Sequence, residues 1–123
     1  MSTNNHLFNI DAIVVDGVAL AFEGGTGEIE GAGRWENEVV PSASGDDYVK
    51  RKRVATTLKA KIQFGKTSTP DAFSGLSEVQ ISARDIKTGR RCLMPKCTFG
   101  SMGSIGQGSV DITFNVLSAP QWL

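Results

Sequence analysis

The chain has 123 residues, of which 13 are basic and 13 are acidic, so its formal net charge is zero. This length allows one domain, residues 1–123, with a single core and no second lobe that could form an interdomain cleft. The balanced charge points neither to nucleic acid nor to a membrane surface, so any electrostatic role must come from local patches. No basic leader precedes an apolar run and no run reaches membrane-spanning length, so we expect a soluble protein made in the cytoplasm, without secretory signal or anchor.

The first predicted element is a hairpin. Residues 1–6 are polar, include His6, and are expected to form a loose terminus. Asp16-Gly17 then stands between apolar residues, which is the strongest short-range signal for a two-residue turn. We therefore expect two short strands, roughly from Asn9 to Val15 and from Val18 to Phe22.

A glycine-rich, acidic stretch follows the hairpin. Repeated glycine over residues 23–33 lowers both strand and helix propensity. Acidic side chains around it share one parity and Ile29, Trp35 and Val39 share the other, so a strand here would carry a mainly acidic face. Such a face is either a solvated outer surface or an acidic wall that faces a molecule to which it must not bind. Its acidic residues are Glu28, Glu30, Glu36 and Glu38.

The next segment is predicted to be an arm. Residues 40–48, with the sequence VPSASGDDY, have turn chemistry and no apolar periodicity, so they are expected to form a loop. The loop leads into residues 50–53, KRKR, the densest positive run in the chain. This run is open to three interpretations, namely a solvated hairpin arm, a protein contact or a phosphate-binding site. No aromatic residues interleave with it to stack bases, which disfavours single-strand binding.

Two long strands are expected to organise the fold. Apolar and polar residues alternate over residues 53–65 and again over 108–119, and only a strand puts two such sets on opposite faces. Two half-buried strands of this length imply an antiparallel β domain. The side chains expected to face the core are Val54, Thr56, Leu58, Ala60, Ile62 and Phe64 on the first strand and Val110, Ile112, Phe114 and Val116 on the second.

Between these strands we expect a short helix and a second hairpin. Ser68-Thr69-Pro70-Asp71 carries helix-start signals, and Phe73 and Leu76 lie three apart, so they could plug one end of a barrel. Alternation over residues 78–85 and a turn at 87–90 predict two further strands. Pro95 cannot donate to a strand ladder, so it suggests an edge strand or a bulge. Trp122 is expected either to fold back on the core or to contact a neighbour.

We find no constellation of catalytic residues. The single histidine, His6, lies in the polar N-terminus, and the glycine-rich segments lack the phosphate-loop pattern. Cys92 and Cys97 are expected to be free thiols, and they make a poor metal site because a closed zinc site requires four ligands. We therefore expect no enzyme activity, no cofactor and no metal. A small β domain with exposed strand edges and no active site is expected to self-associate.

In order and spacing these features resemble the phage tail tube proteins of Mu-like and related tailed phages, which are related to secretion-system tube proteins. The resemblance covers nearly the whole chain and contains no diagnostic short motif. It is carried by the hairpin IVVDGVAL, the stretch GGTGEIEG, the loop VPSASGDDY, the helix TPDAFSGL, the hairpin EVQISARDIKTGRRCLMPKCTF and the closing strand GSVDITFNVLSA.

The resemblance implies a mainly β subunit, an antiparallel sandwich or barrel with one short helix and an extended loop. It further implies hexameric rings in which strands of six subunits close one inner barrel, stacked into a tube in the virion tail and assembled in the host cytoplasm. DNA would pass through the lumen without specific binding. Implied partners are the tail sheath or tail terminator, the baseplate and the tape measure protein.

The resemblance also implies roles for particular residues. The arm over residues 40–52 would contact a neighbouring subunit or the next ring, and the acidic residues would form a negative inner wall. Lys59 and Lys61 lie on the outward parity of their strand, so such a wall would not be uniformly acidic. The implied interface residues are Pro41, Ser42, Asp46, Asp47, Tyr48, Lys50, Arg51, Lys52 and Arg53, and the implied wall residues are Glu28, Glu30, Glu36 and Glu38.

Three alternatives stay open on the sequence. A secretion-system tube of the same fold is barely separable from a phage tube. A monomeric β-barrel would bind nucleic acid through residues 50–53, with an affinity that depends on salt. A small hydrolase would require His6 or one of the two cysteines.

Overall fold

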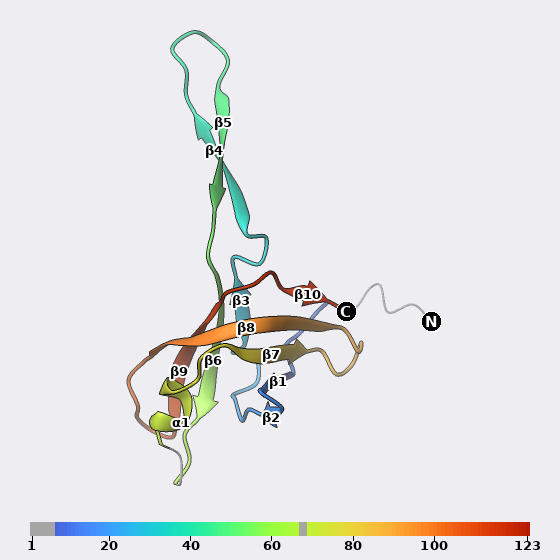
Figure 1. Cartoon of the computed structure of the whole chain (residues 1–123), viewed down its shortest axis with the longest axis vertical. Coiled ribbons are helices and arrows are strands. Elements are labelled where there is room, and N and C mark those ends of the chain that lie inside the picture. Colours follow the sequence, from blue (N-terminus) through green and yellow to red (C-terminus); the bar gives the residue numbers. More distant parts are fainter. Residues whose placement is uncertain (1–6, 67–68) are drawn as a thin grey trace.

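The computed structural model describes residues 7–66 and 69–123 and shows a small β body from which a narrow arm projects (Figure 1). His6 and Ser68 lie outside the described residues. The elements are β1 Ala12–Val15, β2 Val18–Ala19, β3 Glu28–Glu30, β4 Trp35–Val40, β5 Tyr48–Arg53, β6 Thr56–Gln63, α1 Asp71–Ser74, β7 Val79–Arg84, β8 Arg91–Met102, β9 Ser109–Val116 and β10 Gln121–Trp122.

The body is one antiparallel sheet in the order β2-β1-β7-β8-β9-β6-β3, with β10 also paired to β8. β6 and β9 pair along their whole length, from Thr56 opposite Val116 to Gln63 opposite Ser109. The alternation predicted for these strands is confirmed, although the first one starts at Thr56 rather than at Arg53. The buried side chains are Thr56, Leu58, Ala60 and Ile62 on β6 and Val110, Ile112, Phe114 and Val116 on β9.

The segment after β2 closes this sheet into a barrel. Leu20 N donates to Ile13 O on β1 at 2.8 Å, and Glu23 N donates to Lys61 O on β6 at 2.8 Å. β1 and β6 lie towards opposite ends of the sheet order, so one short segment joins both sides. The core fills the inside of this antiparallel barrel, which is the fold class expected from the sequence.

The predicted N-terminal hairpin is present. Asp16 and Gly17 have φ values of 49° and 82°, and a two-residue turn of this kind needs positive φ at both positions. The strands on either side are shorter than expected. Asp11 bonds to Arg84 on β7, and residues 21–23 leave the hairpin and bond to β6.

The expectation of a single acidic strand across residues 28–39 is wrong. β3 ends at Glu30, and Gly31 and Arg34 then have φ values of 69° and 66°, so the chain turns before β4 begins at Trp35. β3 pairs with β6 in the barrel, whereas β4 pairs with β5 in a separate two-stranded sheet. The turn interrupts the alternation of side chains, so residues of the same parity before and after it do not share one face.

The bulge interpretation of Pro95 is confirmed and the edge interpretation is wrong. Pairing between β7 and β8 moves from Val79 opposite Cys97 to Ile81 opposite Met94, which leaves one extra residue on β8. β8 nevertheless lies between β7 and β9, because the bulge removes the need for a ladder donor at the proline.

The predicted helix is a single turn. α1 follows Pro70, which has helical φ and ψ, and no side chain caps its first turn. Phe73 and Leu76 pack against the core, as expected from their spacing.

Both cysteines are free thiols inside the core, with no exposed surface. Burial raises the pKa of Cys92, and burial together with the neighbouring Cys92 raises the pKa of Cys97 to about 12. Both side chains are therefore protonated at neutral pH and unreactive in the folded protein.

Asp85 fastens the N-terminal segment to the turn between β7 and β8. Its carboxylate accepts hydrogen bonds from Asn9 N at 3.2 Å, Lys87 N at 3.0 Å and Thr88 N at 3.3 Å. Burial raises the pKa of Asp85, but these donors favour the charged form and hold the pKa below its ordinary value of 3.8.

We expect Asp85→Asn to lower the melting temperature at neutral pH and to leave it nearly unchanged relative to wild type in acid. A carboxyl with a lowered folded pKa stabilises the fold above its unfolded pKa, and this contribution is lost as the pH falls through the folded pKa. Thermal unfolding of both proteins from neutral pH to about pH 2 checks this prediction. A difference in melting temperature that stays constant with pH would contradict it.

Candidate functional site

The arm is a two-stranded ribbon that stands away from the barrel (Figure 1). β4 and β5 pair in register from Trp35 opposite Arg53 to Val40 opposite Tyr48, and every residue of both strands is exposed. A lone two-stranded ribbon is at best marginally stable in water. This arm is therefore the first candidate for a surface that a partner covers.

One face of the arm carries paired opposite charges. Glu36 lies opposite Lys52 and Glu38 lies opposite Lys50, and the pair Val40 and Tyr48 completes this face near the tip. Opposite charges directly across an antiparallel pair contribute roughly 0.2–1 kcal/mol each. Half of the basic run predicted as a phosphate or protein contact therefore lies directly across from acids of the same arm.

The other face holds an aromatic ring close to two guanidinium groups. Arg51 lies 4.3 Å and Arg53 lies 5.5 Å from the centre of the Trp35 ring. Guanidinium groups over an indole face are attracted by its quadrupole, by about 0.5–1 kcal/mol at exposed sites. Val39 and Val49 face each other further along the same side. The sequence does not reveal this cluster, because it depends on the pairing register.

The loop at the tip is ordered by its own hydrogen bonds. Ser42 N donates to Asp47 Oδ1 at 3.2 Å, and Ser44 N donates to Ser42 Oγ at 3.2 Å. Gly45 has a φ of 119°, a conformation that glycine adopts without strain. Pro41 and Asp46 are exposed on the same loop. The structure thus brings all nine predicted interface residues together on one projecting element.

Apolar side chains concentrate at the end of the arm. Val39, Val40, Tyr48 and Val49 are 61%, 41%, 66% and 66% exposed. Exposed apolar residues that are contiguous mark interaction surfaces, whereas isolated ones are ordinary. Tyr48 is among the interface residues predicted from the sequence, whereas the three valines are not.

A second surface is the polar outer face of β3, β6 and β9. Lys59 Nζ lies 3.1 Å from Glu30 Oε1, and Lys61 Nζ lies 3.9 Å from Glu23 Oε2. Asp111 on β9 is the cross-strand partner of Lys61. The face is therefore mixed in charge, as the outward parity of the two lysines predicts.

The four residues proposed as an acidic wall do not form one surface. Glu28 and Glu30 lie on β3, on the outer face of the barrel, beside Lys59. Glu36 and Glu38 lie on β4 in the arm. Only Glu28 and Glu30 can therefore belong to an acidic wall on the barrel face.

This polar face is formed by a four-stranded part of the sheet, β8–β9–β6–β3. Its two outer edges, at β3 and at the end of β8, are unpaired within the described part of the chain. Among the described residues, β3 pairs only with β6, and the last residues of β8, from Ser101 to Met102, pair only with β9. Unpaired edges of this kind are sites where another chain can add a strand.

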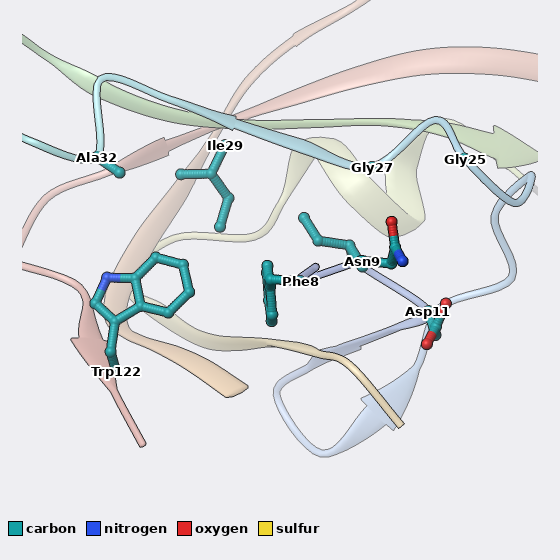
Figure 2. A pocket seen from close by; sticks show the side chains of 9 residues that line it. Phe8, Asn9, Asp11, Gly25, Gly27, Ile29, Ala32 and Trp122 are labelled. Carbon is teal, nitrogen blue, oxygen red and sulfur yellow. The ribbon is translucent and has the colours of Figure 1, made fainter. Parts of the chain in front are cut away.

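A hollow of about 400 Å³ opens beside the C-terminal strand (Figure 2). The ring of Trp122 packs edge-on against Phe8, with centroids 5.3 Å apart, and Arg90 lies 5.0 Å over the indole. Trp122 is therefore folded back on its own chain. The polar side chains of the lining are those of Asn9 and Asp11, and the backbone N–H of Asn9 donates to Asp85.

Residues 7–66 and 69–123 contain no group of three or more His, Cys, Asp or Glu side chains arranged to hold a metal ion. No helix within these ranges has the length and apolar character needed to span a membrane.

Comparison with solved structures finds chains of similar fold. A chain of the PVC sheath–tube complex of an extracellular contractile injection system, in its extended state, superposes with a TM-score of 0.60 at 10% identity, covering 100% of this chain and 98% of that one. The protein shares that chain's fold. A chain of the PVC sheath/tube terminator, also in the extended state, gives a TM-score of 0.58 at 10% identity, covering 100% and 97%.

Both solved structures are assemblies of an injection system rather than enzymes. No protein-family model and no curated protein matches the chain. The likeness at this identity concerns the fold alone.

Proposed function

We propose that this protein is a structural subunit that forms hexameric rings and that these rings stack into a tube. The observation that carries the proposal is the four-stranded sheet β8–β9–β6–β3, which has a polar outer face and unpaired outer edges. The shared fold with a chain of a sheath–tube complex supports the same conclusion.

In the proposed ring, β3 of one copy pairs with the end of β8 of the next. Such a contact joins two different surfaces, so it closes into a ring when the rotation between copies is right. The polar face of the sheet then lines the channel. Four acids, Glu23, Glu28, Glu30 and Asp111, and two lysines, Lys59 and Lys61, lie on or beside this face. The excess of acids would weakly repel DNA phosphates.

The finer form of the proposal is a phage tail tube through which the genome is ejected, located in the virion. Its partners would be the tail sheath or terminator, the baseplate and the tape measure protein. A tube of a contractile injection system is the second candidate, and the solved structures with this fold favour it. Genes for capsid and tape measure proteins beside this gene would support the phage tube, whereas their absence would support the injection system.

The arm weighs against a nucleic-acid-binding monomer. Glu36 and Glu38 face two of the four basic residues, and Trp35 holds the other two. A monomeric binder would show DNA affinity that falls steeply with salt and is lost when residues 50–53 are neutralised. We expect no such affinity.

Electron microscopy and analytical ultracentrifugation of the purified protein test the assembly. We expect sixfold rings with a central channel, and tubes at higher protein concentration. The Phe114→Ala variant, whose core is damaged, serves as a control that should lose both forms. A wild-type protein that stays monomeric at every concentration, with neither rings nor tubes, would refute the proposed function.

A further inference from the structure

We propose that the arm tip of one copy, through Val40 and Tyr48, docks in an apolar groove between the β1–β2 hairpin and α1 of a second copy. This inference rests on the proposed function, because it assigns the contact that stacks one ring on the next. It concerns two surfaces that lie at opposite ends of the molecule (Figure 1).

The groove is an apolar hollow of about 330 Å³ at the end of the barrel away from the arm. Val18 on its rim is 69% exposed, so the apolar surface is open to solvent. Asp16, in the hairpin turn, is the one charged residue of the lining. The other lining residues are Val15, Val18, Leu20, Ala72, Phe73 and Leu76.

The arm tip matches this groove in chemistry. Val40 and Tyr48 are cross-strand partners at the end of the ribbon, on the same face as Lys50. A tyrosine side chain buries about 150–250 Å² when it is fully covered, so one ring inserted in the groove would remove much of the exposed apolar surface on both sides. Lys50 follows next along this face and offers a positive charge to Asp16.

Only a second copy can bring these surfaces together. The ribbon points away from the barrel and the groove lies at the other end of the molecule, so the tip does not contact the groove of its own chain. A contact between two different surfaces at opposite ends repeats along one axis and builds a fibre. One such contact is small, but a ring would make all its contacts at once, which multiplies the affinity.

Cysteine cross-linking tests the contact directly. We expect the double variant Val18→Cys with Val40→Cys to form a ladder of disulfide-linked multimers when its tubes are oxidised. The matched control is Val18→Cys with Val39→Cys, in which the second cysteine points to the opposite face of the arm and should stay unlinked. Cys92 and Cys97 are fully buried and will not contribute. The inference would be overturned if the control variant formed the disulfide ladder instead, or if neither variant formed it although tubes were present.

Complementation provides an independent test. Tyr48→Ser damages only the tip and Val18→Glu damages only the groove, and both positions are exposed, so both variants should keep the wild-type melting temperature. Each variant alone should form rings but need roughly tenfold or more protein to form tubes. Tyr48→Ser rings keep an intact groove and Val18→Glu rings keep an intact tip. Mixing the two should therefore give stacks of two rings that grow no further, because the outer surfaces of each stack carry only damaged sites.

The outcomes separate this inference from the proposed function. If the wild type forms no rings, the proposed function fails. If the wild type forms tubes and both variants form them at the same concentration, the tip and groove contact is wrong while the tube function stands.

Discussion

Phe114→Ala is expected to lower the free energy of unfolding by about 3–5 kcal/mol, the usual loss for a large aromatic side chain in a core. Phe114 is 2% exposed, lies on the central strand β9, and packs edge-on against Phe99 with ring centroids 6.5 Å apart. Removing the ring leaves a cavity that the surrounding strands cannot fill, because they are held by ladders on both sides. Small domains have a total stability of about 5–15 kcal/mol, so this variant would be close to unfolding.

Guanidinium unfolding followed by tryptophan fluorescence measures this effect. Asp111→Ala is the matched control, because it lies on the same strand with its side chain exposed, and it should change stability by no more than about 0.5 kcal/mol. Equal losses in the two variants would mean that β9 does not hold the core as described.

Gly31→Ala is expected to destabilise the base of the arm by about 2 kcal/mol or more, since a left-handed backbone alone costs an alanine roughly 1–2 kcal/mol. Gly31 has a φ of +69°, and a Cβ there would overlap the carbonyl oxygen of Ala55. The same turn is fixed by Thr56 Oγ1, which donates to Gly31 O at 2.8 Å, and by Val54 N, which donates to Arg34 O at 2.8 Å. The variant therefore forces the two chain segments at the arm's base apart.

Gly33→Ala is the control, since a Cβ at Gly33 meets no atom within 4 Å and its φ lies outside the strained range. It should be neutral, or more stable by up to about 1 kcal/mol. Thermal unfolding measures stability, and electron microscopy shows whether tubes still form. We expect Gly31→Ala to impair tubes because the arm direction changes, and to weaken rings as well because Gly31 directly follows the β3 edge. Identical behaviour of both glycine variants would show that the turn does not set the arm.

The arm shows how far reasoning from sequence reaches for the candidate site. Turn chemistry over residues 40–48 and the positive run after it predict a projecting element, and the structure has one. That Glu36 and Glu38 face Lys52 and Lys50, and that Trp35 lies against two arginines, depends on the register of β4 against β5. A shift of one residue would move every side chain to the other face, and nothing in the composition excludes it.

The acidic stretch shows a different limit. Glycine at residue 31 suggests a bend, but the space that excludes a Cβ there is set by Ala55, which is 24 residues away in the chain. The division of the four glutamates between barrel and arm therefore could not be predicted from spacing. Likewise, spacing could not predict that Trp122 packs on Phe8, at the other end of the chain, rather than in the core, and that the residue stays 42% exposed.

Features that depend on near neighbours in the chain could be predicted from the residues. Strict alternation set which faces of β6 and β9 are buried, and Asp16-Gly17 set the first turn, because side-chain direction and φ are local properties. The tertiary structure alone decided the closure of the barrel through residues 20–23, the unpaired edges of β3 and β8, and the separation of the arm tip from the groove. Each of these depends on which distant strands meet and in what register, and that is decided by the burial of the whole core rather than by any one segment.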